Sequence, residues 1–224
     1  TNGDIGGDST IYTQASTVTA TAMGNYGYIS INNNGNQAGS VSVTLNSSGD
    51  SYFTNNGDIA VVGSNSAYYY SLTANSGSIL QGNNGLIQAY TTVLAADNNI
   101  GTSDVPVQVS TTYLTANAYG LNSTNGDVYL THTGTDGIYL VGDSSAVGNF
   151  SLSAPNSTGY WGISVGNGYD SGTVTAGGTI TLSSSASIEG YGYTNMLTAP
   201  AVVLSATNGD IGGDSTIYTQ ASTV

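Results

Sequence analysis

Short runs in which apolar and small polar residues alternate occur along the whole chain. Each run is bounded by Gly, Asn, Asp or Ser, and no apolar stripe with a helical period persists long enough to form a helix. An alternating run between turn residues is typical of a half-buried β-strand. The pattern therefore predicts an all-β protein made of short strands. Clear examples are Tyr28–Ile31, Val41–Leu45, Ile138–Leu140, Val174–Ala176 and Thr179–Leu182.

A loose motif recurs within these runs: an aliphatic residue, a small polar residue and usually Ala, followed by a turn that contains Gly. Nine steps of this motif separate Val18 from Val224, so the mean step is roughly 23 residues, a length typical of one solenoid coil. The motif therefore predicts a parallel β-solenoid with about nine coils in 206 residues. Its aliphatic positions are Val18, Val43, Leu72, Leu94, Leu114, Leu130, Leu152, Val174, Leu197 and Val224.

A turn motif, Asn-Gly-Asp followed by Ile or Val, gives the same number of coils. It begins at Asn2, Asn56, Asn125 and Asn208, so the gaps between its occurrences lengthen along the chain. Asn-Gly favours tight turns because both residues tolerate positive φ. The three gaps fit two, three and four coils, which again sum to nine.

The first eighteen residues, Thr1 to Val18, reappear without a change as Thr207 to Val224. Identity over this length indicates a tandem repeat. We therefore expect residues 1–206 to form one complete solenoid unit, and residues 207–224 to begin the next identical unit of a longer array. Since the open end of a parallel stack is an unpaired sheet edge, joining one unit directly to the next would remove that edge.

A chain of immunoglobulin-like sandwiches is the competing all-β arrangement. Such domains contain about 100 residues, with a buried Trp near the centre. This chain has one Trp and three Pro in 224 residues, and no Pro-rich linker. The solenoid is favoured, and nine coils stacked about 4.8 Å apart would extend roughly 43 Å along the axis.

The charge of the chain restricts its partners. It contains 13 acidic residues, one His and no Lys or Arg, which gives a formal net charge of −13. Nucleic-acid binding is excluded because phosphate contacts depend on Lys and Arg, and an anionic membrane surface would repel the chain. No apolar run is long enough to span a bilayer, and the absence of Cys is compatible with an extracellular or cell-surface location.

Three segments resemble filamentous-haemagglutinin-type adhesins: Leu72–Ile79, Val174–Leu182 and Leu204–Gly213. The resemblance implies a right-handed parallel β-helix exported to a bacterial surface. Two features depart from that family, because the chain has no Lys or Arg and its duplication is exact over eighteen residues. Both departures favour the shaft of a fibre over a binding tip.

No residues are expected to form a catalytic or cofactor-binding site, and we do not expect an enzyme. Polysaccharide-cleaving β-helices use Arg or Lys to stabilise developing negative charge, and this chain has neither. The acids nearest in sequence, such as Asp136 with Asp143 and Asp4 with Asp8, lie in turns where Asp is favoured for turn chemistry. His132 is expected to be an ordinary outward-facing strand residue.

Weak binding of Ca²⁺ at Asp-Gly turns is the metal chemistry that the sequence allows. Carboxylates and backbone carbonyls of such turns can ligate a hard cation, but no calcium-binding motif is present. The favoured interpretation is that Asp caps these turns, so no metal ligand is predicted. The candidate turns contain Asp4, Asp8, Asp58, Asp127 and Asp143.

Exposed aromatic and amide side chains supply the remaining candidates. Tyr68–Tyr70, Tyr191 and Tyr193 could pack fibres laterally, stack on carbohydrate or form a tyrosine ladder. The Thr17–Thr21 run suggests an ice-binding face, but only some coils carry such a run. Asn-X-Ser/Thr sequons begin at Asn46, Asn122, Asn149 and Asn156.

The sequence therefore favours a structural repeat of a long extracellular or cell-surface filament. Its main partner would be another copy of itself, end to end along the axis and also laterally between fibres, with no nucleic acid and no membrane insertion. A solenoid adhesin that binds surface glycans is the alternative. An ice-binding solenoid and a polysaccharide-processing β-helix are less favoured.

Overall fold

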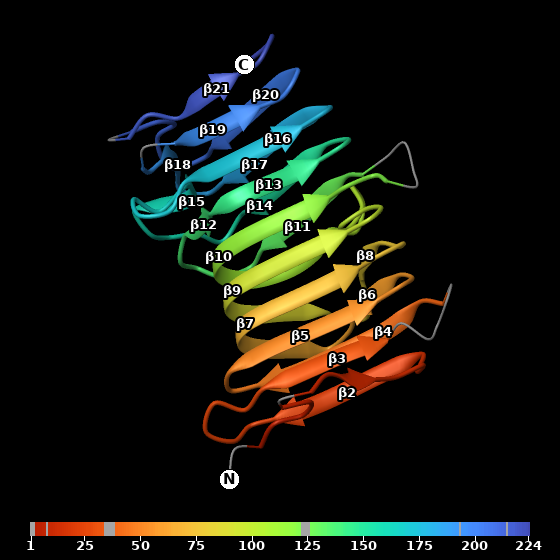
Figure 1. The fold of residues 1–224 in the computed structure, drawn as a ribbon. Helices are drawn as coiled ribbons and strands as arrows, with labels where there is room; N and C mark the ends of the chain where they lie inside the picture. Colours follow the sequence, from red (N-terminus) through yellow and green to blue (C-terminus); the bar gives the residue numbers. More distant parts are fainter. Residues whose placement is uncertain (1–2, 8, 34–38, 122–125, 193, 214) are drawn as a thin grey trace.

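The computed structural model describes residues 3–7, 9–33, 39–121, 126–192, 194–213 and 215–224. These residues form 21 strands and no helix, and all the strand pairings between them are parallel. The chain winds through about nine turns of a β-solenoid, which confirms the predicted fold and number of coils. Figure 1 shows the coils stacked in sequence order, with the two termini at opposite ends of the stack.

Most strands are short, apart from β7, β9 and β10 with 11, 11 and 12 residues, and most are separated by Gly-containing turns. Their bounds are β1 (Ile11–Tyr12), β2 (Thr17–Ala22), β3 (Ile29–Asn33), β4 (Val41–Ser47), β5 (Asp50–Asn55), β6 (Ile59–Val61), β7 (Ser64–Ala74), β8 (Ile79–Gln81), β9 (Leu86–Ala96), β10 (Val107–Ala118), β11 (Val128–His132), β12 (Ile138–Leu140), β13 (Gly142–Ala146), β14 (Phe150–Ala154), β15 (Trp161–Val165), β16 (Gly172–Ala176), β17 (Thr179–Ser184), β18 (Ser187–Gly190), β19 (Asn195–Thr198), β20 (Ala201–Ala206) and β21 (Tyr218–Gln220).

One stack of strands runs the length of the solenoid. It contains β2, β4, β6, β8, β11, β14, β17 and β20, with single bridges through Ile100 joining β8 to β11. One inward column of this stack is aliphatic except for one Phe, and each member is at most 1% exposed. Burying such a side chain stabilises the fold by about 1.5–3 kcal/mol. The column consists of Val41, Ile59, Ile79, Ile100, Val128, Phe150, Ile180 and Val202.

The opposite side of the solenoid changes along the axis. In the N-terminal half it has one strand per coil, through β3, β5, β7, β9 and β10. Strand β10 then pairs with three strands of the next coil. Its first residues pair with β11, Tyr113 pairs with Tyr139 in β12, and Ala118 pairs with Ala146 in β13. From there two stacks continue, β12–β15–β18 and β13–β16–β19–β21. In the C-terminal half this part of each coil is therefore formed by two strands instead of one.

Coil length varies because turns differ while the strand columns are preserved. The chain between the column neighbours Phe150 and Ile180 is much longer than the chain between Val41 and Ile59. One added loop lies between β15 and β16, where Gly166 and Gly168 have φ angles of 83° and 87° that favour Gly. This variation explains an error in the predicted marker series.

The marker residues do not form one column. Val18 pairs with Val43, and Leu72 with Leu94, as the motif predicts. Two further predicted steps, Leu130 to Leu152 and Val174 to Leu197, are also direct pairs. However, Leu94 pairs with Ala116, and Leu152 pairs with Leu182. The series therefore moves between stacks, although its total of about nine coils is right.

Candidate functional site

One turn of the repeated segment has the same conformation at both ends of the solenoid. Gly6 and Gly212 are equivalent residues and have φ angles of 87° and 80°. In each copy the same turn follows, with the amide of Ser9 donating to Gly6 O (2.7 Å) and that of Ser215 donating to Gly212 O (3.1 Å). The local structure is therefore set by the segment itself, independently of which end it occupies.

The two copies pair in opposite directions along the axis. In the first copy, Ile5 pairs with Ile29 of the following coil. The Ile5 amide donates to Tyr28 O (2.7 Å), and Ile5 O accepts from the Ser30 amide (2.9 Å).

In the second copy, Ile211 pairs with Ile188 of the preceding coil. The Ile188 amide donates to Asp210 O (2.9 Å), and the Gly212 amide donates to Ile188 O (2.9 Å). The first copy therefore bonds through the backbone amide and carbonyl of Ile5. The second copy bonds through the carbonyl of Asp210 and the amide of Gly212, the two residues that flank Ile211. A single strand can form both sets at once, as an interior strand of a sheet does.

The second strand position of the segment shows the same division. The Thr13 amide donates to Asn32 O of the following coil (2.9 Å). In the other copy, Gln220 O accepts from the Ala199 amide of the preceding coil (3.2 Å). Gln220 is equivalent to Gln14, so the two bonds again use different groups of the segment.

The third strand position repeats this arrangement. Ser16 O accepts from the Ser42 amide of the following coil (3.0 Å), and Thr223 O accepts from the Val202 amide of the preceding coil (3.0 Å). Each of these backbone groups of the repeated segment bonds either to the following coil in the first copy or to the preceding coil in the second copy, and none does both. Each copy therefore leaves uncovered the edge that the other copy uses.

Burial of the two copies reflects these uncovered edges. Val18 is 8% exposed under the following coil, whereas its equivalent Val224 is 77% exposed. Ile211 is likewise half exposed at its end of the solenoid. The apolar surface at the C-terminal end is what a further coil would bury.

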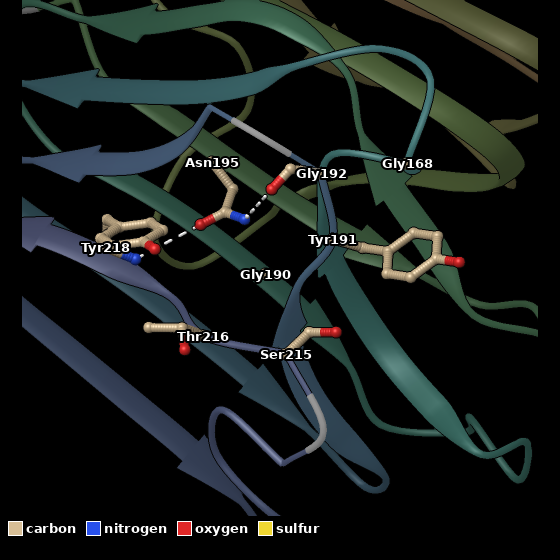
Figure 2. A pocket seen from close by; sticks show the side chains of 8 residues that line it. All are labelled: Gly168, Gly190, Tyr191, Gly192, Asn195, Ser215, Thr216 and Tyr218. Atoms are coloured by element: carbon tan, nitrogen blue, oxygen red, sulfur yellow. Dashed lines mark hydrogen bonds between the residues drawn. The ribbon is translucent and has the colours of Figure 1, made fainter.

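Buried Asn side chains clamp both copies to their neighbouring coils. The side-chain Nδ2 of Asn33 donates to Ala15 O (3.0 Å), and Asn33 Oδ1 accepts from the backbone amide of Ala15 (3.0 Å). Figure 2 shows Asn195, whose side-chain Nδ2 donates to Gly192 O (3.1 Å) and whose Oδ1 accepts from the backbone amide of Tyr218 (3.4 Å). The latter clamp lies in an open, polar pocket of about 370 Å³ that Ser215 and Thr216 also line.

Aromatic rings of successive coils lie in contact with one another, and we call this set the aromatic ladder. Neighbouring ring centroids are 5.0–5.5 Å apart. Sequence reasoning named Tyr68 and Tyr69, where the two runs of this set meet, but missed its extent, although its Tyr residues recur about once per coil. One run is Tyr28, Tyr52 and Tyr69, and the other is Tyr68, Tyr90, Tyr113, Tyr139 and Trp161.

Not all residues of the predicted exposed aromatic surface are exposed. Tyr70 is fully buried, and its hydroxyl donates to Asn65 Oδ1 (2.8 Å). Burial raises the pKa of Tyr70 well above its usual range. Tyr68 and Tyr191 are exposed as predicted, and Tyr193 lies outside the described residues.

The C-terminal end of the aromatic ladder opens into a cleft of about 260 Å³, which we call the aromatic cleft. The pKa of Tyr139 in this cleft is raised by burial, with contributions from the Tyr191 hydroxyl and the Glu189 carboxylate. The cleft therefore combines aromatic faces with a carboxylate. Its lining residues are Tyr139, Tyr160, Trp161, Ser164, Glu189, Tyr191 and Ser215.

The Asp residues of the predicted calcium turns form hydrogen bonds between coils. Asp4 Oδ1 accepts from the Tyr28 amide (3.1 Å), and Asp58 Oδ1 accepts from the Ser78 amide (2.8 Å). Asp127 Oδ1 accepts from the Asn149 amide (2.6 Å). These carboxylates accept hydrogen bonds from backbone amides in the next coil. They therefore cap turns as predicted, but the capped turns belong to the neighbouring coil.

The other acidic candidates are dispersed. Asp143 Oδ1 accepts from the Thr173 hydroxyl (2.6 Å), whereas Asp136 contributes its backbone oxygen to a contact with His132. Asp8 lies outside the described residues. Within the part of the chain that the structure describes, no group of three or more His, Cys, Asp or Glu could hold a metal ion.

His132 is buried, so the prediction that it faces outward was wrong. It is 2% exposed, and its Nε2 lies 2.9 Å from Asp136 O. Burial lowers the pKa of His132, although the contact with Asp136 O acts in the opposite direction. The alternation in β11 carries the missing signal, because His132 falls on the same face as Val128 and Leu130.

The sequons differ in their surroundings. Asn149 Nδ2 donates to Asp127 Oδ1 (3.2 Å), and its Oδ1 accepts from the Thr179 amide (2.9 Å). Asn46 Oδ1 accepts from the Ser66 hydroxyl (2.9 Å), while Asn156 is exposed. Asn122 lies outside the described residues.

No protein-family model, curated protein sequence or solved structure matches this chain. No helix among the described residues is long and apolar enough to cross a membrane. The repeated segment, the aromatic ladder and the aromatic cleft are the candidate functional features of this chain.

Proposed function

We propose that the chain is a structural repeat of a long extracellular fibre in which successive 206-residue units continue one β-solenoid. The carrying observation is that identical segments occupy opposite ends and pair through different backbone groups. Superposing the second copy of one unit on the first copy of the next gives every one of these groups a partner. The repeated segment would then be the joint between units.

The proposed contact is head to tail, so it generates an open filament. The termini lie at opposite ends of the stack (Figure 1), as a continuing solenoid requires. Each unit would add nine coils, or roughly 43 Å, to the length of the fibre. Apolar surface and sheet edges would be uncovered only at the fibre ends, which limits edge-to-edge aggregation.

The surface charge suits a coat around such a fibre. Removing the two acids of the second copy, Asp210 and Asp214, from the total of 13 leaves 11 per unit, and the sequence has no Lys or Arg to neutralise them. Parallel fibres would repel one another at low ionic strength and approach as salt screens the charge. Divalent cations would bridge neighbouring fibres through these carboxylates.

Small-angle X-ray scattering of a two-unit chain tests this function. The sample is residues 1–206 followed by residues 1–224, compared with the 224-residue chain alone. We expect one rigid rod longer by roughly 43 Å with an unchanged cross-section. A bent or articulated pair of rods would exclude a continuous solenoid.

A glycan-binding adhesin is the second candidate, and the aromatic cleft is the observation that favours it. Aromatic faces beside a carboxylate are suited to sugar rings that stack and donate hydrogen bonds. Screening the chain against immobilised surface polysaccharides distinguishes the two roles. Saturable retention by one polysaccharide, lost when Tyr191 is replaced by Leu, would support the adhesin.

A further inference from the structure

We propose that the aromatic cleft binds an organic ammonium ion, with Glu189 supplying the counter-charge and Trp161 and the exposed Tyr191 supplying aromatic faces. This assigns a ligand chemistry to a site that the mechanical role does not require. The cleft lies within a single chain, so this proposal can be tested independently of the fibre.

The composition of the cleft is unusual within this sequence. The chain has one Trp and one Glu, and both line the same cleft. The other twelve acidic residues are Asp, and several of them accept backbone hydrogen bonds from the next coil. Glu189 lies within β18, beside the inward-facing Ile188, and is only 7% exposed.

A carboxylate with so little exposure favours a cationic ligand. Water screens its charge weakly at a buried position, so it attracts a cation in the cleft more strongly than an exposed carboxylate would. The sequence contains no Lys or Arg, so an ammonium group at this cleft has to come from a ligand. Glu189 and Trp161 line the same cleft, so the carboxylate lies beside the aromatic wall.

Trp161 is the last ring of the aromatic ladder and supplies one aromatic wall of the cleft. Tyr139 lies between Tyr113 and Trp161, at centroid distances of 5.4 and 5.5 Å, so its faces are covered by these two rings. Tyr160 and Tyr191, both exposed, lie at the same cleft. A cation over an aromatic face is attracted by the ring quadrupole, most strongly for Trp, and quaternary ammonium groups are recognised in this way.

The size of the cleft restricts the ligand to a small group. Its volume of about 260 Å³ is slightly below the usual range for drug-sized ligands. A choline group or a single amino sugar matches this scale. Both carry an ammonium on a small organic body, and the two sources can be separated by titration.

The cleft also lies beside the proposed joint. Ser215 belongs to the repeated segment and is equivalent to Ser9 of a following unit. If the fibre proposal holds, the cleft recurs once per unit along the fibre. Weak binding at each cleft would then add up on a multivalent surface.

Titration of the intrinsic fluorescence of Trp161 tests the proposal, because the single Trp reports on this cleft alone. Choline, glucosamine, N-acetylglucosamine and glucose are added separately to the 224-residue chain at constant ionic strength. We expect a saturable change with choline, glucosamine or both, and none with the two neutral sugars. Choline alone would indicate a quaternary ammonium, and glucosamine alone an amino sugar. Equal binding of the neutral sugars, or no saturable change with any ligand, would overturn the proposal.

Two matched pairs of variants locate the site. Glu189→Gln should weaken binding by at least about tenfold, since it removes a charge partner at a buried position, whereas Asp104→Asn removes one exposed charge elsewhere and should not. Tyr191→Leu should weaken binding, whereas Tyr119→Leu, at a similarly exposed position (49% and 47%), should not. The exposed Tyr191 position keeps the test valid if Glu189→Gln does not fold. Unchanged affinity in the Tyr191→Leu variant and in a folded Glu189→Gln variant would refute the assignment.

Discussion

Ile5 and Ile211 are the same residue of a repeated segment, yet they pair in opposite directions along the solenoid. Ile5 pairs with Ile29 of the following coil, and Ile211 pairs with Ile188 of the preceding coil. The hydrogen bonds of the two sites involve different backbone groups. One copy therefore shows how the segment receives the next coil, and the other shows how it adds to the last.

The equivalent glycines of the segment provide a matched pair for testing this relationship. A Cβ added at Gly6 would clash with Ser30 O, whereas at Gly212 the nearest atom is Ser215 O at 4.0 Å. Both φ angles are positive, so either substitution costs about 1–2 kcal/mol. Gly6→Ala should cost about 1–3 kcal/mol more, because the following coil has to move.

Urea denaturation of the two variants measures this difference. Equal destabilisation in the 224-residue chain would contradict the distinct packing of the two copies. In a two-unit chain the difference should disappear for the copy at the joint, because that glycine then has a coil on both sides.

The inward column predicts a large effect at Phe150. It lies between Val128 and Ile180 and is fully buried, so Phe150→Ala should destabilise the chain by about 3–5 kcal/mol. Val147→Ala, at an exposed position on the preceding turn, should change stability by less than about 0.5 kcal/mol. Chemical denaturation measures both, and similar losses for the two variants would be inconsistent with this column.

We expect the buried His132 to lower the free energy of unfolding on mild acidification. Burial lowers its pKa in the folded state, so the unfolded chain binds more protons as the pH falls below about 6.5, the usual pKa of His. The His132 contribution is fully present above that pH and is lost as the pH decreases toward the folded pKa. His132→Asn should remove this component.

Nuclear magnetic resonance can follow His132 directly, because it is the only His in the chain. Its ring protons should titrate with a midpoint below the usual value for His. A midpoint at or above that value would show that the ring is solvated and that the assigned burial is wrong.

We expect Tyr52 to cause a loss of stability at alkaline pH. Burial, together with the negative charge of Asp50, raises its pKa from 10.0 to about 12. The folded chain therefore retains a proton that the unfolded chain loses, so this contribution is present below pH 10 and is lost as the pH rises toward 12. Tyr52→Phe should flatten this loss relative to Tyr26→Phe, which changes an exposed tyrosine outside the aromatic ladder. Thermal unfolding across this alkaline range measures it, and parallel curves for the two variants would count against it.

Much of the fold is predictable from the sequence because a strand pattern is local. The alternation in Val41–Ser47 and the Gly- and Asn-rich turns indicate short strands without reference to the rest of the chain. The number of coils is also predictable, because the exact duplication supplies the length of the unit. Assignment to individual stacks is not, because Leu94 and Leu114 carry the same motif but pair with different neighbours.

The candidate sites were less predictable because they depend on which residues of different coils lie side by side. Glu189 and Trp161 lie on strands that pair between adjacent coils, but coil length varies so much that spacing alone does not determine their proximity. The burial of His132 was available from the alternation in β11. The opposite pairing of the two copies required the structure, because their sequences are identical.

Electron cryo-microscopy of the two-unit chain shows directly whether the solenoid continues through the joint. We expect one uninterrupted solenoid in which Asp210 O and Gly212 N bond to Ile188, while Ile211 N and O bond to the second unit's equivalents of Tyr28 and Ser30. The coil spacing through the joint should remain about 4.8 Å. Two separate solenoids, with the repeated segment paired on one side only, would show that the segment is not a joint.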